Sequence, residues 1–153
     1  MNIIFLDVDG VLNMYGSSYR TFMKPCGQHI EPHIVQRLNY ICENVKDLKI
    51  VISSSWRLVM EDLEKQIKEQ GFKYWDKVID KTPNLNFRGE EIKKWIDIKS
   101  FNGKYLVLDD EKVYICGDYC NEIPKENVLQ TDGNEGLLHK DAMYIINYFK
   151  EVK

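Results

Sequence analysis

The sequence lacks features of secreted and membrane-spanning proteins. No hydrophobic run approaches the roughly 20 residues that a helix needs to cross a bilayer. Residues 1–7 contain no basic leader and no small-residue cleavage site, so we expect no signal peptide. We therefore expect a cytoplasmic protein with no membrane association.

Cysteines are few, and their spacing excludes a simple zinc site. The chain has four, and Cys116 and Cys120 are separated by three residues with no second pair to complete a metal site. We expect free thiols. The formal net charge is −3, which argues against unspecific nucleic-acid binding through overall charge but leaves room for a local basic groove.

The chain also lacks repeats and low-complexity tracts, and its composition is that of a globular protein. Its 153 residues are 44% hydrophobic and 29% charged. This length is typical of one domain, so we predict a single domain over residues 1–153.

Short hydrophobic runs alternate with segments of helical periodicity. We predict strands at Asn2–Leu6, Lys49–Ile52, Val78–Ile79, Lys104–Leu108 and Asn127–Leu129. We predict helices from Pro32 onward and at Leu58–Gln70, Gly89–Ile98 and Glu135–Phe149. This alternation indicates an α/β fold with a doubly wound, Rossmann-like parallel sheet. Ligands of such sheets bind beyond the carboxyl ends of the strands.

Polar side chains follow three of these predicted strands. Asp7 and Asp9 close the first run, Ser53 to Ser55 the second, and Asp109 to Glu111 a later one. Separately, a surface turn, a helix N-cap and a solvated loop explain them. Together they predict a divalent metal site beside a phosphate site, since paired carboxylates repel unless they share a proton or a cation.

The segment Asp7-Val8-Asp9-Gly10-Val11 resembles the Asp-x-Asp motif of the haloacid dehalogenase (HAD) superfamily of phosphatases. The serine and Asp-Asp strand ends follow in that superfamily's order. Arg88, 21 residues before Asp109, lies where the family carries a basic residue. The segments Val51–Arg57 and Arg88–Ile92 further resemble the small HAD domains of RNA-repair proteins, which share their architecture with polynucleotide 3′-phosphatases.

The resemblance implies a chemistry for each of these positions. Asp7 is the expected nucleophile and Asp9 the expected acid–base. Ser54, with Ser53 as second choice, and Arg88 are expected to hold the phosphate, with Lys93 and Lys94 as competitors of Arg88. The expected Mg²⁺ ligands are Asp7, Asp9 through its carbonyl oxygen, Asp109 and Asp110.

The expected substrate is a phosphorylated molecule, with an RNA or DNA 3′-phosphate end as the favoured class. Residues 13–31 are long enough for a small flap as cap, but too short for a lid domain, and an open site suits a large substrate. In this segment, which also contains Met14, the aromatic residues Tyr15, Tyr19 and Phe22 are candidates for stacking on a base or, alternatively, for closing the sheet edge. The candidate phosphate contacts are Arg20, Lys24 and Arg57. A phosphatase of free nucleotides or other small esters is the alternative enzyme, and a HAD-like binding module the non-catalytic one. We expect no obligate protein partner.

Overall fold

The computed structural model describes residues 1–14 and 29–151. Within them, five parallel strands form one sheet in the order β3-β2-β1-β4-β5. The strands are β1 (Asn2–Leu6), β2 (Leu48–Ile52), β3 (Val78–Lys81), β4 (Lys104–Asp109) and β5 (Val128–Gln130). The predicted α/β parallel sheet is thereby confirmed.

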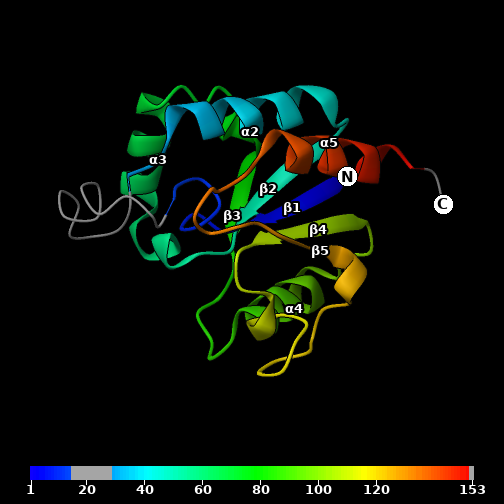
Figure 1. Ribbon diagram of the computed structural model, residues 1–153. Coiled ribbons are helices and arrows are strands. Elements are labelled where there is room, and N and C mark those ends of the chain that lie inside the picture. Colours follow the sequence, from blue (N-terminus) through cyan, green and yellow to red (C-terminus); the bar gives the residue numbers. More distant parts are fainter. Residues whose placement is uncertain (15–28, 152–153) are drawn as a thin grey trace.

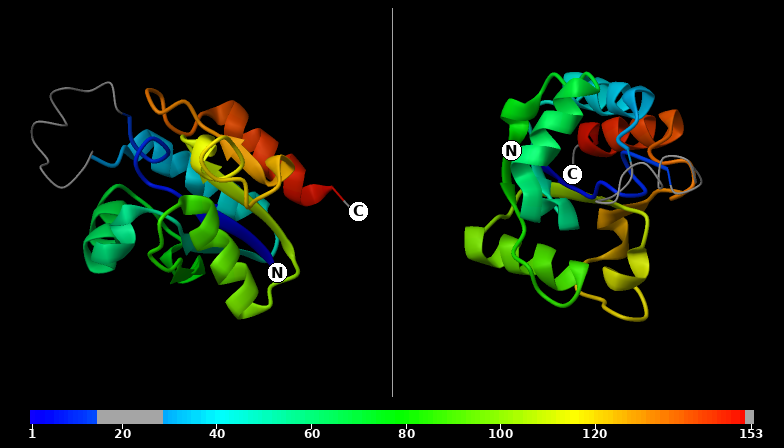
Figure 2. Two further views of the ribbon diagram at one scale, coloured as in Figure 1. Left: turned by 90° about the horizontal axis from the view of Figure 1, so that it is seen from below. Right: turned by 90° about the vertical axis from the view of Figure 1, so that its left-hand side faces the viewer.

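Helices cover both faces of this sheet (Figures 1 and 2). They are α2 (Pro32–Asn44), α3 (Met60–Glu69), α4 (Arg88–Lys99) and α5 (His139–Lys150). Helices α2, α3 and α5 pack on one face in a large hydrophobic cluster, and α4 packs on the other in a smaller one. Short 3-10 turns connect the elements: η1 (Ser55–Val59), η2 (Trp75–Lys77), η3 (Lys112–Tyr114) and η4 (Lys125–Asn127).

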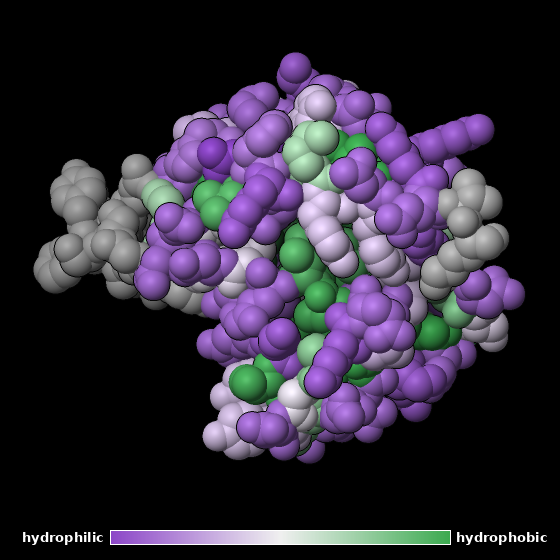
Figure 3. All heavy atoms as spheres, turned by 45° about the vertical axis from the view of Figure 1, so that its right-hand side comes forward, coloured by the Kyte–Doolittle hydropathy of each residue, from purple (hydrophilic) through white to green (hydrophobic). Residues whose placement is uncertain are grey.

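The central strand β1 is hydrophobic because it is covered on both faces. Ile3, Ile4 and Phe5 are completely buried, and side chains alternate between the two clusters along the strand. The helices turn polar side chains outward, so the face shown in Figure 3 is largely hydrophilic. Among the described residues, no helix has the length and hydrophobicity needed to cross a membrane.

Two helices begin later than the sequence pattern predicts. The expected helix Leu58–Gln70 starts at Met60, because the polypeptide first forms the 3-10 turn η1. The expected helix Glu135–Phe149 starts at His139. Here Asp141 Oδ2 accepts a hydrogen bond from the Leu138 N–H at 2.9 Å, which satisfies an amide at the helix N-terminus.

Candidate active site

A cleft of about 380 Å³ lies at the carboxyl edge of the sheet. Five of the seven predicted site residues line it: Asp7, Asp9, Arg88, Asp109 and Asp110. The other two, Ser53 and Ser54, are each 1% exposed and are not among its lining residues. The strand order explains this convergence, because β1 lies between β2 and β4 and all three strands end at the same edge.

Three carboxylates gather at the ends of β1 and β4. Asp7, Asp109 and Asp110 each offer an oxygen atom within 4.8 Å of the others. The Asp7 N–H donates to the Leu108 carbonyl at 3.1 Å, which extends the pairing of the two strands past the end of β1. Carboxylate oxygens are the ligands that Mg²⁺ prefers, so this trio fits the predicted metal.

Gly10 allows Asp110 to join this group. The glycine has a φ of +83°, and a Cβ atom added there would lie 2.6 Å from Asp110 Cγ. Both its backbone conformation and the close approach of the Asp110 side chain therefore favour glycine. The glycine of the Asp-x-Asp-Gly segment therefore has a structural role, since it leaves room for the Asp110 side chain.

Burial and neighbouring carboxylates raise the pKa values of two of these carboxyls. Burial, and after it the Asp109 carboxylate, hold the pKa of Asp7 well above its usual range. Burial raises the pKa of Asp109 to about 7, even though the Arg88 guanidinium lowers it. Both carboxyls therefore hold their protons to a higher pH than exposed carboxyls do, and a divalent cation would stabilise their ionised forms.

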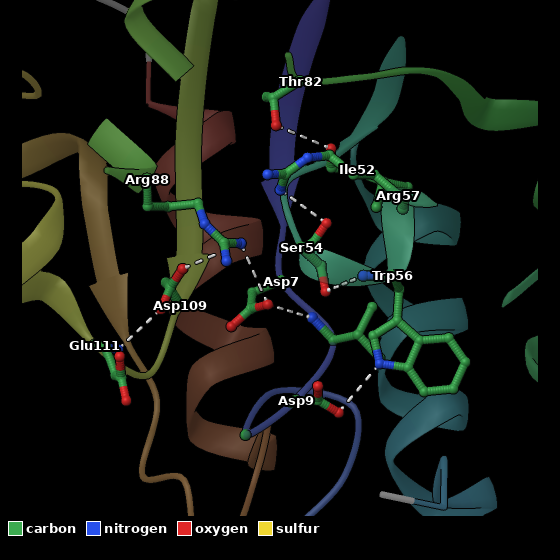
Figure 4. Close-up of polar contacts among 12 residues, drawn as sticks. Asp7, Asp9, Ile52, Ser54, Trp56, Arg57, Thr82, Arg88, Asp109 and Glu111 are labelled. Carbon is green, nitrogen blue, oxygen red and sulfur yellow. Dashed lines mark hydrogen bonds and ion pairs between the residues drawn. The ribbon is translucent and has the colours of Figure 1, made fainter. Parts of the chain in front are cut away.

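Arg88 is directed at this cluster, as Figure 4 shows. Its Nη1 lies 3.4 Å from Asp7 Oδ1 and 3.9 Å from Asp109 Oδ2. Burial lowers the pKa of Arg88, but the carboxylates around it outweigh burial and raise it above its ordinary value. Lys93 instead pairs with Asp97 at 2.6 Å, and Lys94 is exposed; neither lines the cleft.

The Asp9 side chain lies apart from the acidic trio of Asp7, Asp109 and Asp110 and points toward η1. Its Oδ1 accepts hydrogen bonds from Trp56 Nε1 at 3.2 Å and from Asn13 Nδ2 at 2.9 Å. The Gly10 N–H donates to Asn13 Oδ1 at 2.8 Å and so holds the asparagine. The Asp9 side chain is therefore not part of the carboxylate cluster, and the expected metal contact through its carbonyl oxygen stays a prediction.

The two serines differ in their hydrogen bonding. Ser54 Oγ accepts from the Trp56 N–H at 3.2 Å and caps η1. Ser53 Oγ is buried and has no hydrogen-bond partner among the described residues. Burying an unsatisfied hydroxyl costs free energy, so this atom needs a partner more than Ser54 does.

Arg57, an expected phosphate contact, lines the cleft, but its side chain is mostly buried and is held by other residues. It is 6% exposed and pairs with the equally buried Glu91, with 2.5 Å between Nη2 and Oε2. It also donates to the Ser54 carbonyl at 2.9 Å. Glu91 Oε1 lies 3.5 Å from Arg88 Nε, so this carboxylate holds both arginines.

The sequence analysis did not single out several residues of the cleft, nor Trp56, which contacts the cleft residue Asp9. Trp56 and Glu91 lie within the segments that resemble RNA-repair HAD domains, and the spacing of Arg88 and Glu91 on one helix face was a usable signal. No sequence signal indicated Phe87 and Tyr114, which also line the cleft. Five of the candidate substrate contacts lie outside the described residues: Tyr15, Tyr19, Arg20, Phe22 and Lys24. The same holds for most of the expected flap and for Cys26, one of the four cysteines.

Comparison with known proteins gives a family match. The family described as the HAD domain in Swiss Army Knife RNA repair proteins matches residues 3–142. No curated protein and no solved structure matched the chain. The matched range contains every residue of the cleft described above.

Proposed function

Because the chain belongs to this family of HAD domains from RNA repair proteins, we propose that it is a Mg²⁺-dependent phosphomonoesterase acting on nucleic-acid 3′-phosphate ends. The observation that carries the proposal is the position of Asp7. This buried carboxylate sits within reach of a second acidic group, Asp109 with Asp110, and of the Arg88 guanidinium. The residues proposed as nucleophile, metal ligands and phosphate-binding cation thus line one cleft.

Asp7 is the proposed nucleophile. Its carboxylate oxygen attacks phosphorus, the ester P–O bond breaks, and the electron pair leaves with the substrate alcohol, which takes a proton from Asp9. Water then attacks the phosphorus of the aspartyl phosphate and gives a proton to Asp9. This hydrolysis releases inorganic phosphate and restores the Asp7 carboxylate. Acid–base assistance of this kind is typically worth ~10²–10⁴-fold in rate.

The chain's own residues arrange this reaction. Trp56 and Asn13 hold the Asp9 carboxylate through its Oδ1. Arg88 provides a cation for the transferring phosphoryl group, and Ser53 and Ser54 are the proposed hydroxyl contacts, with the unsatisfied Ser53 Oγ the stronger candidate.

The acidic trio fits Mg²⁺ in donor type and spacing. Asp7, Asp109 and Asp110 would hold it, with the Asp9 carbonyl oxygen as the further proposed ligand. When bound, the cation offsets the repulsion between an anionic nucleophile and an anionic phosphate.

The test is phosphate release from a 3′-phosphorylated oligonucleotide with and without Mg²⁺. We expect Asp7→Asn and Asp9→Asn to abolish turnover while the folded state is retained. Asp62→Asn, an exposed aspartate on α3 outside the cleft, is the matched control and should keep the wild-type rate. Mg²⁺-dependent turnover by Asp7→Asn would contradict the assigned nucleophile, and inactivity of the wild-type protein on every phosphate ester would support a binding module instead.

A further inference from the structure

Three aromatic rings stack in a row beside the cleft. The Phe87 and Tyr114 ring centroids are 6.3 Å apart with 15° between the planes. The Tyr114 and Tyr119 centroids are 5.3 Å apart with 16° between the planes. We call these three residues the aromatic stack. The rings are nearly parallel and offset, and Tyr114 contacts both of the others, so Phe87 and Tyr119 are the two ends of the stack.

Phe87 is the end of the stack that belongs to the cleft. It directly precedes Arg88, and Phe87, Arg88 and Tyr114 all line the same cavity as Asp7. Tyr119, at the other end, is not among the lining residues and is 65% exposed. The cleft therefore joins an acidic, phosphate-handling part to an aromatic part.

The segment before Phe87 is held in place by the buried ion pair. The Leu85 N–H donates to Glu91 Oε2 at 2.9 Å, and Arg57 Nη2 donates to Asn84 Oδ1 at 2.7 Å. The loop that carries Phe87 is thus tied to the same groups that hold Arg88. A ring positioned in advance loses little conformational entropy when a ligand packs on it.

We propose that the nucleobase next to the scissile phosphate packs on the cleft end of the aromatic stack, against Phe87 with Tyr114 behind it. This inference rests on the proposed function, since it places the phosphate beside Asp7 and Arg88. Every nucleobase has a π face, so stacking on aromatic side chains recognises a nucleotide without reading its sequence. The ligand chemistry is therefore a base-bearing phosphomonoester, either an oligonucleotide end or a free nucleotide.

The test compares substrates that differ only in the terminal base. Phosphate release is measured for a 3′-phosphorylated oligonucleotide, for the same oligonucleotide with an abasic terminal residue, and for the 3′-mononucleotide with the same base. The readout is the ratio of kcat/KM for the base-bearing and abasic oligonucleotides. Stacking is typically worth enough per base for a ratio of about 5- to 150-fold.

Substitutions at the two ends of the stack form a matched pair. Phe87→Leu should reduce the ratio toward one, and Phe87→Trp, which restores a flat aromatic surface, should recover it. Tyr119→Leu changes the far end of the same stack and should keep the ratio. Circular dichroism and thermal melting confirm that each variant is folded, and the Phe87→Trp result separates lost stacking from a general disturbance of the loop.

Two outcomes would overturn the inference: a wild-type ratio near one, or an unchanged ratio in folded Phe87→Leu. The mononucleotide arm identifies the source of the ligand. Turnover equal to that of the oligonucleotide indicates a free nucleotide, and lower turnover indicates a nucleic-acid end.

Failure of the proposed function gives a different result, namely no phosphate release from any of the substrates. In that case, binding of the same fluorescently labelled oligonucleotides to Asp7→Asn is measured by anisotropy. Weaker binding of the abasic oligonucleotide, lost in Asp7→Asn/Phe87→Leu, would still support the base site, and equal binding of both would overturn it.

Discussion

The indole Nε1 of Trp56 donates a hydrogen bond to Oδ1 of Asp9 across 3.2 Å, joining the turn after β2 to the turn after β1. Asn13 Nδ2 donates to the same oxygen at 2.9 Å. Two donors on one carboxylate oxygen restrict rotation of the Asp9 side chain. The tryptophan is therefore a positioning residue for the proposed acid–base.

Trp56→Phe should lower kcat about tenfold with little change in KM, because it removes one hydrogen bond to a charged group and keeps an aromatic ring in place. Steady-state kinetics on the 3′-phosphorylated oligonucleotide measure both constants. Trp75→Phe, a half-buried tryptophan outside the cleft, is the control. An equal loss of kcat in both variants would refute the positioning role.

Glu91→Ala should destabilise the protein by about 3–5 kcal/mol, since it leaves the buried charge of Arg57 without its partner. Urea denaturation followed by circular dichroism measures this change. Glu90→Ala, at the neighbouring half-buried position on α4, is the control and should cost much less. A similar loss in both variants would indicate that the charge pair contributes little.

Gly10→Ala should weaken Mg²⁺ binding, because the new Cβ would meet Asp110 at 2.6 Å and displace a predicted ligand. Gly71→Ala is the matched control. It also places alanine at a positive φ, +98°, at a cost of about 1–2 kcal/mol, but it lies away from the carboxylates. Isothermal titration with Mg²⁺ should therefore show reduced affinity only for Gly10→Ala, and unchanged affinity there would argue against Asp110 as a ligand.

The stability of the metal-free protein should depend on the protonation of Asp109. Its pKa rises from 3.8 to about 7 on folding, so the folded state binds this proton more tightly than the unfolded state. Its contribution to stability is complete below about pH 3.8 and is lost as the pH rises through about 7. The free energy of unfolding of the wild type, minus that of Asp109→Asn, should therefore decrease as the pH rises over this range.

Mg²⁺ and the proton compete for the Asp109 carboxylate. Adding Mg²⁺ should therefore stabilise the protein more at pH 8 than at pH 5. Thermal melts with Mg²⁺ and with chelator measure the difference. A difference between wild type and Asp109→Asn that grows with pH in chelator would contradict the raised pKa.

The fold was largely predictable because its signals are local. A strand buried on both faces reads as a continuous hydrophobic run, and β1 has the predicted limits Asn2–Leu6. The polar residues that follow such runs meet at one edge of a parallel sheet, so Asp7 and Asp109 could be placed in one cleft before any coordinates. The positions of α3 and α5 were less exact, because hydrophobic periodicity does not show whether a first turn is helical or is used for a cap.

The partners of the cleft side chains were beyond sequence reasoning. Asp9 and Trp56 are 47 positions apart, and Arg57 and Glu91 are 34 apart. Periodicity reports which face of an element is buried, but not which side chain of a distant element it meets. Those contacts depend on the strand order β3-β2-β1-β4-β5. They also depend on the path that each connecting loop takes at the carboxyl edge of the sheet. The chemistry of the cleft is therefore encoded locally, while its geometry arises from packing between distant segments.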